Sequence, residues 1–387
     1  MHYSAITDRL RDTGGAKWAI HQRSREMRRA GVDIVEMTIG EPDTPTDPKL
    51  IEVASNAMKA GRVRYSNGRG EPELVDALVQ KYSKRRTGVT AENILCFPGT
   101  QTALFATMMA LTEGGVGVLV GDPFYATYEG VIRASGAHPV SVPLRAENGF
   151  RMQLADLARA HTPECKVLLL NAPHNPSGAV LDAKAVSEVG AFCEKHNLWL
   201  VCDEVYEDLI FDGLFHSPFD IPAYARHVIA LSSISKSCAA PGFRSGWAVG
   251  PAEFCERLLP VSETMLFGNQ PFIADMTAYA LNNPPDTPRV MRRNYQRRAQ
   301  VLVEALSGVT GLQPYMPESG MFLLVDVSQT GRDGDAFAWG LLDAGVAVMP
   351  GTSFGASAGD LIRLSLTVPD DLIAKACDRI ATYSETL

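Results

Sequence analysis

Polar side chains capable of chemistry follow three apolar runs in the middle of this 387-residue sequence. Lys166–Asn171 leads into NAPHNPSG, Leu198–Asp203 into DEVY, and Val228–Ser233 into SISKSCAAPGFRSGW. A lysine amine forms a Schiff base with an aldehyde cofactor when its pKa is lowered. Lys236, in SISK, is therefore a candidate for covalent catalysis, although most lysines are solvated surface residues.

Two other charged residues that follow or end these apolar runs suit the same chemistry. Arg244 follows eight residues later, and its guanidinium could both lower the pKa of Lys236 and bind a phosphate. Asp203 ends the run LWLVCD, where it is either a helix-cap or ion-pair aspartate or a charge held beside a protonated pyridine nitrogen. In the second role it would make a pyridine ring an electron sink.

The apolar runs that must position these residues alternate with helical patterns. The predicted strands are Asn93–Phe97, Gly117–Val120, Lys166–Asn171, Leu198–Asp203, Val228–Ser233 and Gly246–Val249, with helices such as Gln101–Leu111 and Ala183–His196 between them. Apolar strands separated by helices indicate a doubly wound α/β domain with a mostly parallel sheet. Ligands bind such sheets at the carboxyl ends of the strands, where the polar residues lie.

The pattern changes at NNPPDTP (Asn282–Pro288), after which a long basic amphipathic helix precedes short strands and a further helix. This mixture predicts a second, smaller α+β domain. We expect an N-terminal arm and part of the small domain in residues 1–45, the large domain in 46–285 and the small domain in 286–387. The first 35 or so residues would pack against the small domain, and Ile39–Leu50 would cross between the two as a loop.

The composition is that of a soluble globular protein, with 46% hydrophobic and 21% charged residues. A net charge of −8 argues against a nucleic-acid partner. There is no 18-residue apolar span and no secretory signal, so we expect no membrane crossing. The seven cysteines show no metal-binding spacing, and scattered thiols fit a reducing compartment. A cytoplasmic enzyme without a metal site is the expectation.

Taken together, the motifs from IGEPD to IRLSL resemble the fold-type-I pyridoxal-phosphate enzymes, specifically the class I/II aminotransferases that include aspartate aminotransferase. The resemblance implies pyridoxal 5′-phosphate as the cofactor and Lys236 as its Schiff-base lysine, which also moves the proton. It implies that Ser233 and Arg244 hold the cofactor phosphate and that Asp203 pairs with the pyridine nitrogen.

The resemblance assigns further cofactor contacts. Tyr206 and Asn175 would hydrogen-bond the phenolic oxygen, and Tyr125 would stack on the ring. Gly99, Thr100 and Gln101 open a helix whose backbone N–H groups and dipole would bind the phosphate, although taken alone this segment is a simple strand-to-helix turn.

Three residues outside this group have implied roles in substrate binding and assembly. Arg363, in LIRLSL, matches the arginine that holds the substrate α-carboxylate, the alternative being a surface arginine at a strand edge. Gly40, in IGEPD, would bring its backbone close to the substrate. Tyr65, in RYSNGRG, resembles the tyrosine that reaches the phosphate of a neighbouring subunit, which implies a homodimer. The alternative for Tyr65 is a buried core residue.

The implied reaction moves an amino group between an L-amino acid and a 2-oxo acid by a ping-pong mechanism. Aspartate-specific relatives often carry a lysine where this chain has Gln101. The segments FYATYEGV, ENGFR and APHNPSGA resemble an arginine–pyruvate aminotransferase branch. Aspartate, alanine or an arginine-like donor, with pyruvate, glyoxylate or 2-oxoglutarate as acceptor, all stay open.

Other functions compete with this prediction. A carbon–sulfur β-lyase would use the same lysine, aspartate and arginines, since a fold does not fix a reaction. An aminotransferase-like ligand-sensing regulator would need an added DNA-binding domain, for which Gly40 at position 40 leaves no room. A nicotinamide dehydrogenase is disfavoured because the sequence has no GxGxxG between an early strand and a helix.

Overall fold

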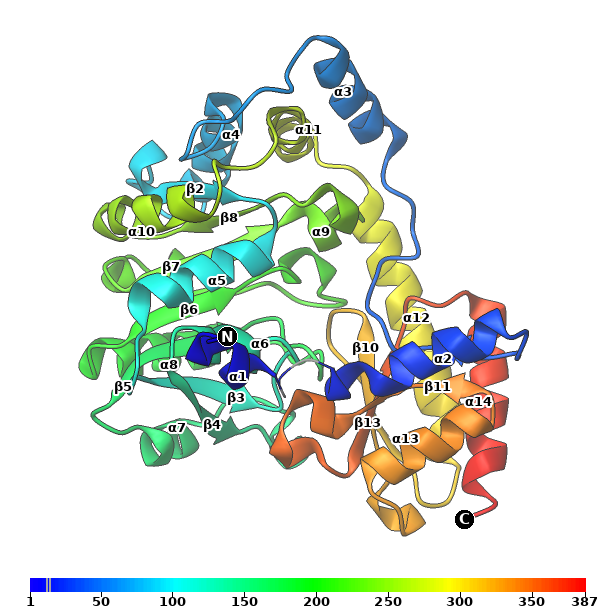
Figure 1. Cartoon of the computed structure of the whole chain (residues 1–387). Helices are drawn as coiled ribbons and strands as arrows, with labels where there is room; N and C mark the ends of the chain where they lie inside the picture. Colours follow the sequence, from blue (N-terminus) through cyan, green and yellow to red (C-terminus); the bar gives the residue numbers. More distant parts are fainter. Residues whose placement is uncertain (12, 14) are drawn as a thin grey trace.

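The computed structural model describes residues 1–11, 13 and 15–387, which form two main sheets, each with its own helices, and a separate two-stranded sheet (Figure 1). The larger sheet has seven strands in the spatial order β2 (Ile94–Phe97), β8 (Gly246–Val249), β7 (Val228–Ser233), β6 (Trp199–Asp203), β5 (Cys165–Asn171), β3 (Gly117–Asp122) and β4 (His138–Pro143). The neighbours from β7 to β4 are parallel, whereas β8 runs antiparallel to both β2 and β7.

Helices cover both faces of the larger sheet. One face packs against α5 (Thr100–Leu111), α6 (Tyr128–Ala134) and α10 (Ala252–Met265), through side chains such as Leu104, Ile132 and Phe254. The other face belongs to the core cluster that includes residues of α3 (Pro48–Lys59), α4 (Pro72–Ser83), α7 (Leu154–Ala160), α8 (Ala183–Lys195) and α11 (Pro271–Asn282). The short helix α9 (Ile234–Ser237) follows β7 directly.

The smaller sheet lies beside the larger one and has the order β12 (Met349–Pro350), β13 (Leu361–Ser365), β10 (Phe322–Asp326) and β9 (Gln313–Tyr315), all antiparallel. The strand β1 (Val35–Glu36) pairs in parallel with β11 (Val346–Ala347). These strands share a core with α2 (Ala19–Arg29), α12 (Thr287–Ser307), α13 (Gly334–Asp343) and α14 (Asp370–Ser384), grouped on one side of the molecule in Figure 1. The predicted fold class, a doubly wound α/β sheet with a smaller α+β part, is confirmed.

Two local expectations differ from the structure. The strand β4 was not predicted because HPVSVP carries two prolines, which lack an N–H for a sheet ladder; it lies at the sheet edge, where prolines are tolerated. Helix α1 (Ala5–Leu10) packs against α6 of the larger sheet, whereas α2 packs with the smaller sheet. Arg9 donates to the last carbonyl groups of α6, those of Arg133 and Ala134, at 3.0 and 3.1 Å.

None of the described helices has the length and apolar character needed to cross a membrane. All seven cysteines are buried as free thiols. Among the described residues, no three histidine, cysteine, aspartate or glutamate side chains gather as a metal site would require.

Candidate active site

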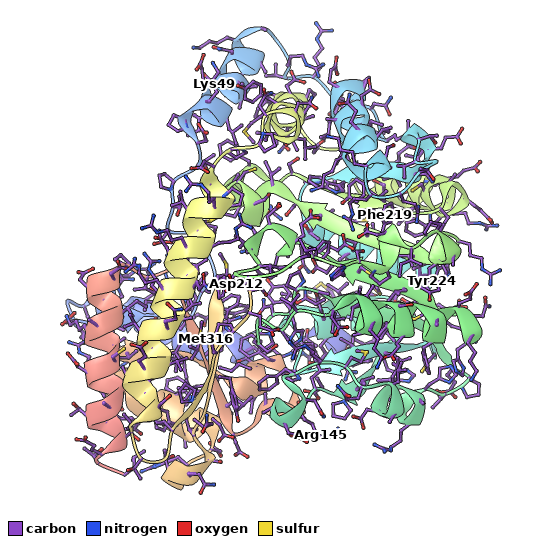
Figure 2. All side chains as sticks on the ribbon, turned by 180° about the vertical axis from the view of Figure 1, so that it is seen from behind. Lys49, Arg145, Asp212, Phe219, Tyr224 and Met316 are labelled. Atoms are coloured by element: carbon purple, nitrogen blue, oxygen red, sulfur yellow. The ribbon has the colours of Figure 1, made fainter. Side chains whose placement is uncertain are left out.

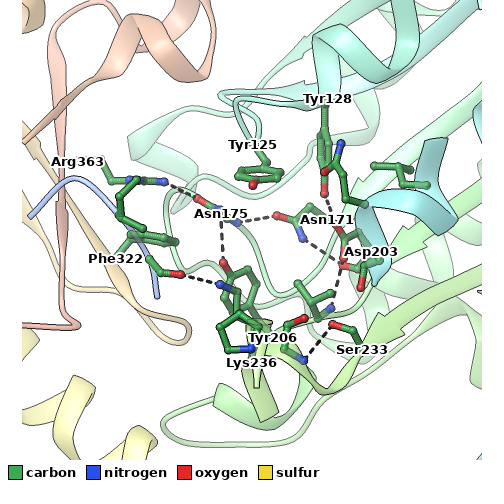
Figure 3. Close-up of a pocket in the computed structure, with 18 of the residues that line it drawn as sticks. Tyr125, Tyr128, Asn171, Asn175, Asp203, Tyr206, Ser233, Lys236, Phe322 and Arg363 are labelled. Atoms are coloured by element: carbon green, nitrogen blue, oxygen red, sulfur yellow. Dashed lines mark hydrogen bonds between the residues drawn. The ribbon is translucent and has the colours of Figure 1, made fainter. Parts of the chain in front are cut away.

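A cavity with about 930 Å³ of empty space opens at the carboxyl ends of β5, β6 and β7, where the larger sheet faces β10 and β13 (Figure 3). Eleven of the residues predicted from the sequence line it: Gly40, Thr100, Gln101, Tyr125, Asn175, Asp203, Tyr206, Ser233, Lys236, Arg244 and Arg363. They come from segments up to 323 positions apart, which meet where the larger sheet faces the smaller one.

Lys236 lies on α9, immediately after β7. Its Nζ donates to the carbonyl oxygen of Gly40 at 2.6 Å. The pKa of Lys236 is lowered to about 8, mainly by burial; Arg363 and Arg244 act in the same direction, while Glu41 and Asp203 oppose them. A substantial fraction of this amine is therefore neutral near physiological pH and available as a nucleophile or base.

Asp203 ends β6 and is buried beneath Tyr128, the first residue of α6. The hydroxyl of Tyr128 donates to Oδ2 of Asp203 at 2.7 Å, and Asn171 donates from Nδ2 to the Asp203 carbonyl at 3.1 Å. Burial raises the pKa of Asp203 to about 6, although the bonds from Tyr128 and the Val205 N–H lower it. The carboxylate is thus poised to gain from a cationic partner in the cavity.

A chain of hydrogen bonds crosses the cavity from Asp203 to Arg363. Oδ1 of Asn171 accepts from the backbone N–H of Asn175 at 2.7 Å, and Asn175 donates from Nδ2 to the Tyr206 hydroxyl at 3.5 Å. On its other side, Oδ1 of Asn175 accepts from Nη1 of Arg363 at 3.2 Å. Figure 3 shows Arg363 and Asp203 at opposite ends, with Asn175 and Tyr206 between them.

Arg363 is a buried cation that makes no salt bridge within the described chain. Its guanidinium lies 3.8 Å from the ring centroid of Phe322 and 4.3 Å from that of Phe354, and Nη2 donates to the Thr38 carbonyl at 2.7 Å. Burial lowers the pKa of Arg363 to about 9, so it stays protonated near neutral pH. Its Nε is buried and has no hydrogen-bond partner among the described residues. A buried, incompletely satisfied guanidinium is suited to binding a carboxylate.

The end of the cavity at the N-terminus of α5 suits a phosphate. Gly99 caps the N-terminus of α5 with φ +88°, and a Cβ there would lie 2.3 Å from Nη2 of Arg244, so only glycine lets the arginine approach the helix end. Thr100 has a buried hydroxyl with no partner in the described chain. The Oγ of Ser233 caps α9 by accepting from the Ser235 N–H at 3.3 Å. A helix N-terminus, an arginine and hydroxyl groups form a donor set that fits the phosphate of pyridoxal phosphate.

Several residues of the cavity were not predicted from the sequence. Besides Tyr128 and Asn171, they are Trp18, Ile39, Leu104, Val205, Ser235, Pro241 and Phe322. Tyr128 lies three residues after the predicted Tyr125 and their rings meet edge to face at 5.6 Å, a spacing that could have identified it. Asn171 is the last residue of a predicted strand, so its position could also have suggested it.

Two predicted residues lie outside the cavity lining. Gly99 precedes the lining residue Thr100, and its lack of a Cβ leaves room for the Arg244 guanidinium. Tyr65 is 93% exposed and contacts Phe267 edge to face at 6.1 Å, beside a separate surface hollow. A single chain therefore does not bring Tyr65 to the cavity, and it is not the buried core residue that was the alternative.

Comparisons with known proteins agree with this geometry. The sequence model of the family described as aminotransferase class I and II matches residues 32–380. The chain is 40% identical to arginine–pyruvate transaminase of Pseudomonas aeruginosa, covering 100% of this chain and 99% of that protein. It is 33% identical to aspartate/prephenate aminotransferase of Thermus thermophilus, covering 94% of each.

Solved structures give the same result. Aspartate aminotransferase from Thermus thermophilus with maleate superposes with a TM-score of 0.93 at 32% identity, covering 99% of this chain and 100% of that one. Aspartate aminotransferase from Rhizobium meliloti gives 0.93 at 26% identity. These relatives favour neither a lyase nor a regulator. The chain belongs to the aminotransferase class I and II family and is a pyridoxal-phosphate-dependent aminotransferase.

Proposed function

We propose that this enzyme takes the amino group from an L-amino acid with a neutral or cationic side chain, with arginine as the first donor to test, and passes it to a small 2-oxo acid such as pyruvate. The observation that carries the proposal is the charge of the cavity lining. In the described chain its charged side chains are Asp203, Lys236, Arg244 and Arg363. Each has a role common to all donors, so no cation is left for a distal carboxylate.

The uncharged part of the lining supports the same donors. Gln101 is neutral, and its Oε1 accepts from the hydroxyl of Thr127 at 3.0 Å. Trp18 and Tyr125 contribute aromatic rings, whose faces attract guanidinium groups. The carboxylate of Glu41 raises the pKa of Lys236, so its negative field reaches the cavity. The 40% identity to an arginine–pyruvate transaminase over the full chain adds to this support.

The proposed roles of the shared residues follow from their chemistry. When bound, pyridoxal phosphate supplies an aldehyde and an electron-withdrawing ring. Asp203 would hold a negative charge at the ring nitrogen, and Tyr206 and Asn175 would bind the phenolic oxygen. Tyr125 would cover the ring. Gly99, Thr100, Gln101, Ser233 and Arg244 would hold the phosphate.

Substrate binding and proton transfer would use the other end of the cavity. Arg363 would bind the α-carboxylate in a bidentate manner, assisted by Asn175. Gly40 would keep its backbone close to the substrate, since a Cβ there would lie 2.1 Å from the Phe322 ring. The neutral amine of Lys236 would take the proton from the α-carbon of the substrate, because its lowered pKa leaves Nζ free to accept one.

A single-turnover experiment tests the donor. The purified holoenzyme is mixed with arginine, alanine or aspartate at matched concentrations, and the loss of the visible cofactor band is followed with the 2-oxo acid formed. Pyruvate, glyoxylate and 2-oxoglutarate are then compared for restoring the band. We expect arginine or alanine to react faster than aspartate. Fastest reaction with aspartate would refute the proposed donor class, and pyruvate and ammonia released without an acceptor would indicate a lyase.

We also propose that the enzyme is a cytoplasmic homodimer in which Tyr65 reaches the phosphate site of the partner subunit. The exposed apolar side chains of Val63, Tyr65 and Phe267 around one hollow support an interface there. The proposed domains within each subunit remain residues 1–45, 46–285 and 286–387. Mixing two inactive variants, Tyr65→Ala and Lys236→Ala, tests the shared site: hybrid dimers should regain activity, and unchanged inactivity at equilibrium would refute it.

A further inference from the structure

A buried ion cluster lies behind the turn that carries Asp203 and Tyr206, outside the cavity lining. The backbone of this turn is closed by the Glu207 N–H, which donates to the Glu204 carbonyl at 2.9 Å. Residues three apart in such a tight turn point to the same side. Asp203 and Tyr206 line the cavity, whereas Glu204 and Glu207 point away from it toward α4.

Two cations at the C-terminal end of α4 hold the two glutamates: Lys81 in its last turn and Arg85 two residues beyond its end. Lys81 donates from Nζ to Oε1 of Glu207 at 2.7 Å. Arg85 donates from Nη1 to Oε2 of Glu204 at 2.9 Å and to Oε2 of Glu207 at 3.3 Å. The side chain of Glu204 is 1% exposed and that of Glu207 is 10% exposed. Solvent therefore screens these pairs much less than surface ion pairs.

The cluster is also linked to the phosphate end of the cavity and to a neighbouring loop. Ser232, which precedes Ser233 on β7, donates from Oγ to Oε1 of Glu207 at 3.4 Å. Arg85 additionally donates from Nε to Oδ1 of Asp220 at 2.7 Å, but Asp220 lies outside the turn and its side chain is 32% exposed. One arginine thus contacts two carboxylates that belong to the turn and one that does not.

Stability alone is a weak explanation for such a cluster. Burying ionised groups carries a desolvation cost, and well-packed apolar side chains of similar volume are often as stabilising or more so. A buried pair with several hydrogen bonds does, however, hold its backbone in one arrangement. Here that backbone is the segment that places both Asp203 and Tyr206.

We propose that Glu207 is a positioning residue: held by Lys81 and Arg85, it fixes the 203–207 turn and so sets the place of the Tyr206 hydroxyl toward the cofactor. The inference rests on the proposed role of Tyr206 in binding the phenolic oxygen. Burial disfavours the charge on Glu207, but Lys81 and Arg85 outweigh it and lower the pKa of Glu207, so the carboxylate is ionised when it binds them.

The test is a double-mutant cycle on the holoenzyme with Glu207→Gln and Tyr206→Phe. The readouts are the affinity for pyridoxal phosphate and the pH midpoint of the visible cofactor band. A hydroxyl that donates to the phenolic oxygen stabilises its anionic form, so displacing it raises that midpoint. We expect Glu207→Gln to raise the midpoint by about 0.5 unit and to weaken cofactor affinity about fivefold. In the Tyr206→Phe background it should have no further effect.

A matched control removes a different carboxylate from the same arginine. Asp220→Asn should change the melting temperature slightly and leave the midpoint and the cofactor affinity unchanged, because Asp220 is not part of the turn. Equal shifts of the midpoint from Asp220→Asn and Glu207→Gln would overturn the proposal, since the cluster would then act only through general stability.

The remaining outcomes separate the inference from the proposed function. If Tyr206→Phe shifts both readouts but Glu207→Gln shifts neither, or adds its effect in full to that of Tyr206→Phe, Glu207 does not act through Tyr206 and the inference fails alone. If Tyr206→Phe shifts neither, the proposed role of Tyr206 fails and the inference with it. Should Glu207→Gln not fold, Lys81→Met replaces it in the cycle and is expected to raise the midpoint by a smaller amount.

Discussion

The hydroxyl of Tyr128 and the carboxylate of Asp203 are joined by a hydrogen bond of 2.7 Å in which both side chains are buried. Burial raises the pKa of Asp203, and this hydrogen bond lowers it. Tyr128→Phe removes the donor and keeps the ring, so Asp203 should become easier to protonate and bind a protonated pyridine nitrogen less well. We expect the affinity for pyridoxal phosphate to fall about tenfold, as for loss of a charge-assisted hydrogen bond. Equilibrium dialysis of the cofactor at pH 7.5 measures it.

A second buried tyrosine provides the control. Tyr295 donates to Oδ1 of Asp43 at 3.2 Å, and neither residue lines the cavity. Tyr295→Phe therefore removes a comparable bond and should change thermal stability without changing cofactor affinity. If both tyrosine variants weaken cofactor binding equally, the Tyr128–Asp203 bond has no special role.

The raised pKa of Asp203 predicts a pH-dependent loss of folding stability in the cofactor-free protein. An unfolded aspartate titrates near 3.8 and folded Asp203 near 6, so between these values the folded state binds more protons. Stability is therefore lost as the pH rises through this window, and the loss persists above it. Asp203→Asn should stabilise the cofactor-free protein at pH 7.5 by up to about 3 kcal/mol, and the gain should shrink toward pH 5. Urea unfolding at both pH values checks this, and a destabilised variant at pH 7.5 would contradict it.

The sequence was informative where chemistry follows a strand directly. Asp203, Ser233 and Lys236 occupy fixed positions after β6 and β7, and the parallel pairing of these strands places their ends at one edge. Local patterns therefore predicted Lys236, Asp203 and Arg244 together with the fold class, whereas the other predicted residues of the cavity came from the resemblance to the class I/II aminotransferases. The resemblance also predicted Arg363, and the apolar residues on both sides of it in LIRLSL favoured a buried charge over a surface arginine.

Residues that reach the cavity through tertiary packing could not be predicted in this way. Trp18 precedes β6 by about 180 positions, and Phe322 comes from the smaller sheet. Nothing in an isolated tryptophan or phenylalanine distinguishes a cavity wall from a core position. The ion cluster behind Asp203 was missed for a related reason, since Lys81 on α4 and Arg85 just after it look like solvated surface residues until the fold places them against Glu204 and Glu207.

Replacing Arg363 should affect the binding of every substrate. Its guanidinium is sandwiched by Phe322 and Phe354 and hydrogen-bonded to Asn175, an arrangement that an ammonium group cannot reproduce. Arg363→Lys should raise the KM of every amino donor and every 2-oxo acid about thirtyfold, equivalent to roughly 2 kcal/mol for a lost charge-assisted contact. Steady-state kinetics with several donors measure the change. A rise confined to one donor would instead assign Arg363 to side-chain recognition.

Gly99 and Gly115 form a matched pair for the phosphate end. Both have positive φ, +88° and +87°, so alanine strains the backbone equally at each. A Cβ at Gly99 would lie 2.3 Å from Nη2 of Arg244, whereas one at Gly115 would meet nothing within 4 Å. We expect Gly99→Ala to weaken binding of pyridoxal phosphate at least tenfold, about 1.4 kcal/mol, and Gly115→Ala to leave it unchanged, although both should lower the melting temperature. Equal affinities in the two variants would show that Arg244 does not need its place beside Gly99.

Gln101 connects the shared chemistry to the choice of donor. It lines the cavity at the start of α5 and hydrogen-bonds Thr127, while the charged residues around it serve groups that every donor shares. Gln101→Lys would add a cation able to pair with a distal carboxylate and repel a distal guanidinium. We expect kcat/KM for aspartate relative to arginine to rise about tenfold or more, since a part-buried charge pair contributes on the order of 1–2 kcal/mol. Alanine, which has no distal group, is the internal control and should change little. If the ratio of kcat/KM for aspartate to kcat/KM for arginine is unaffected while kcat/KM for alanine falls, position 101 acts on the phosphate rather than on the donor. Selection of the donor must then come from Trp18, Tyr125 or a partner subunit.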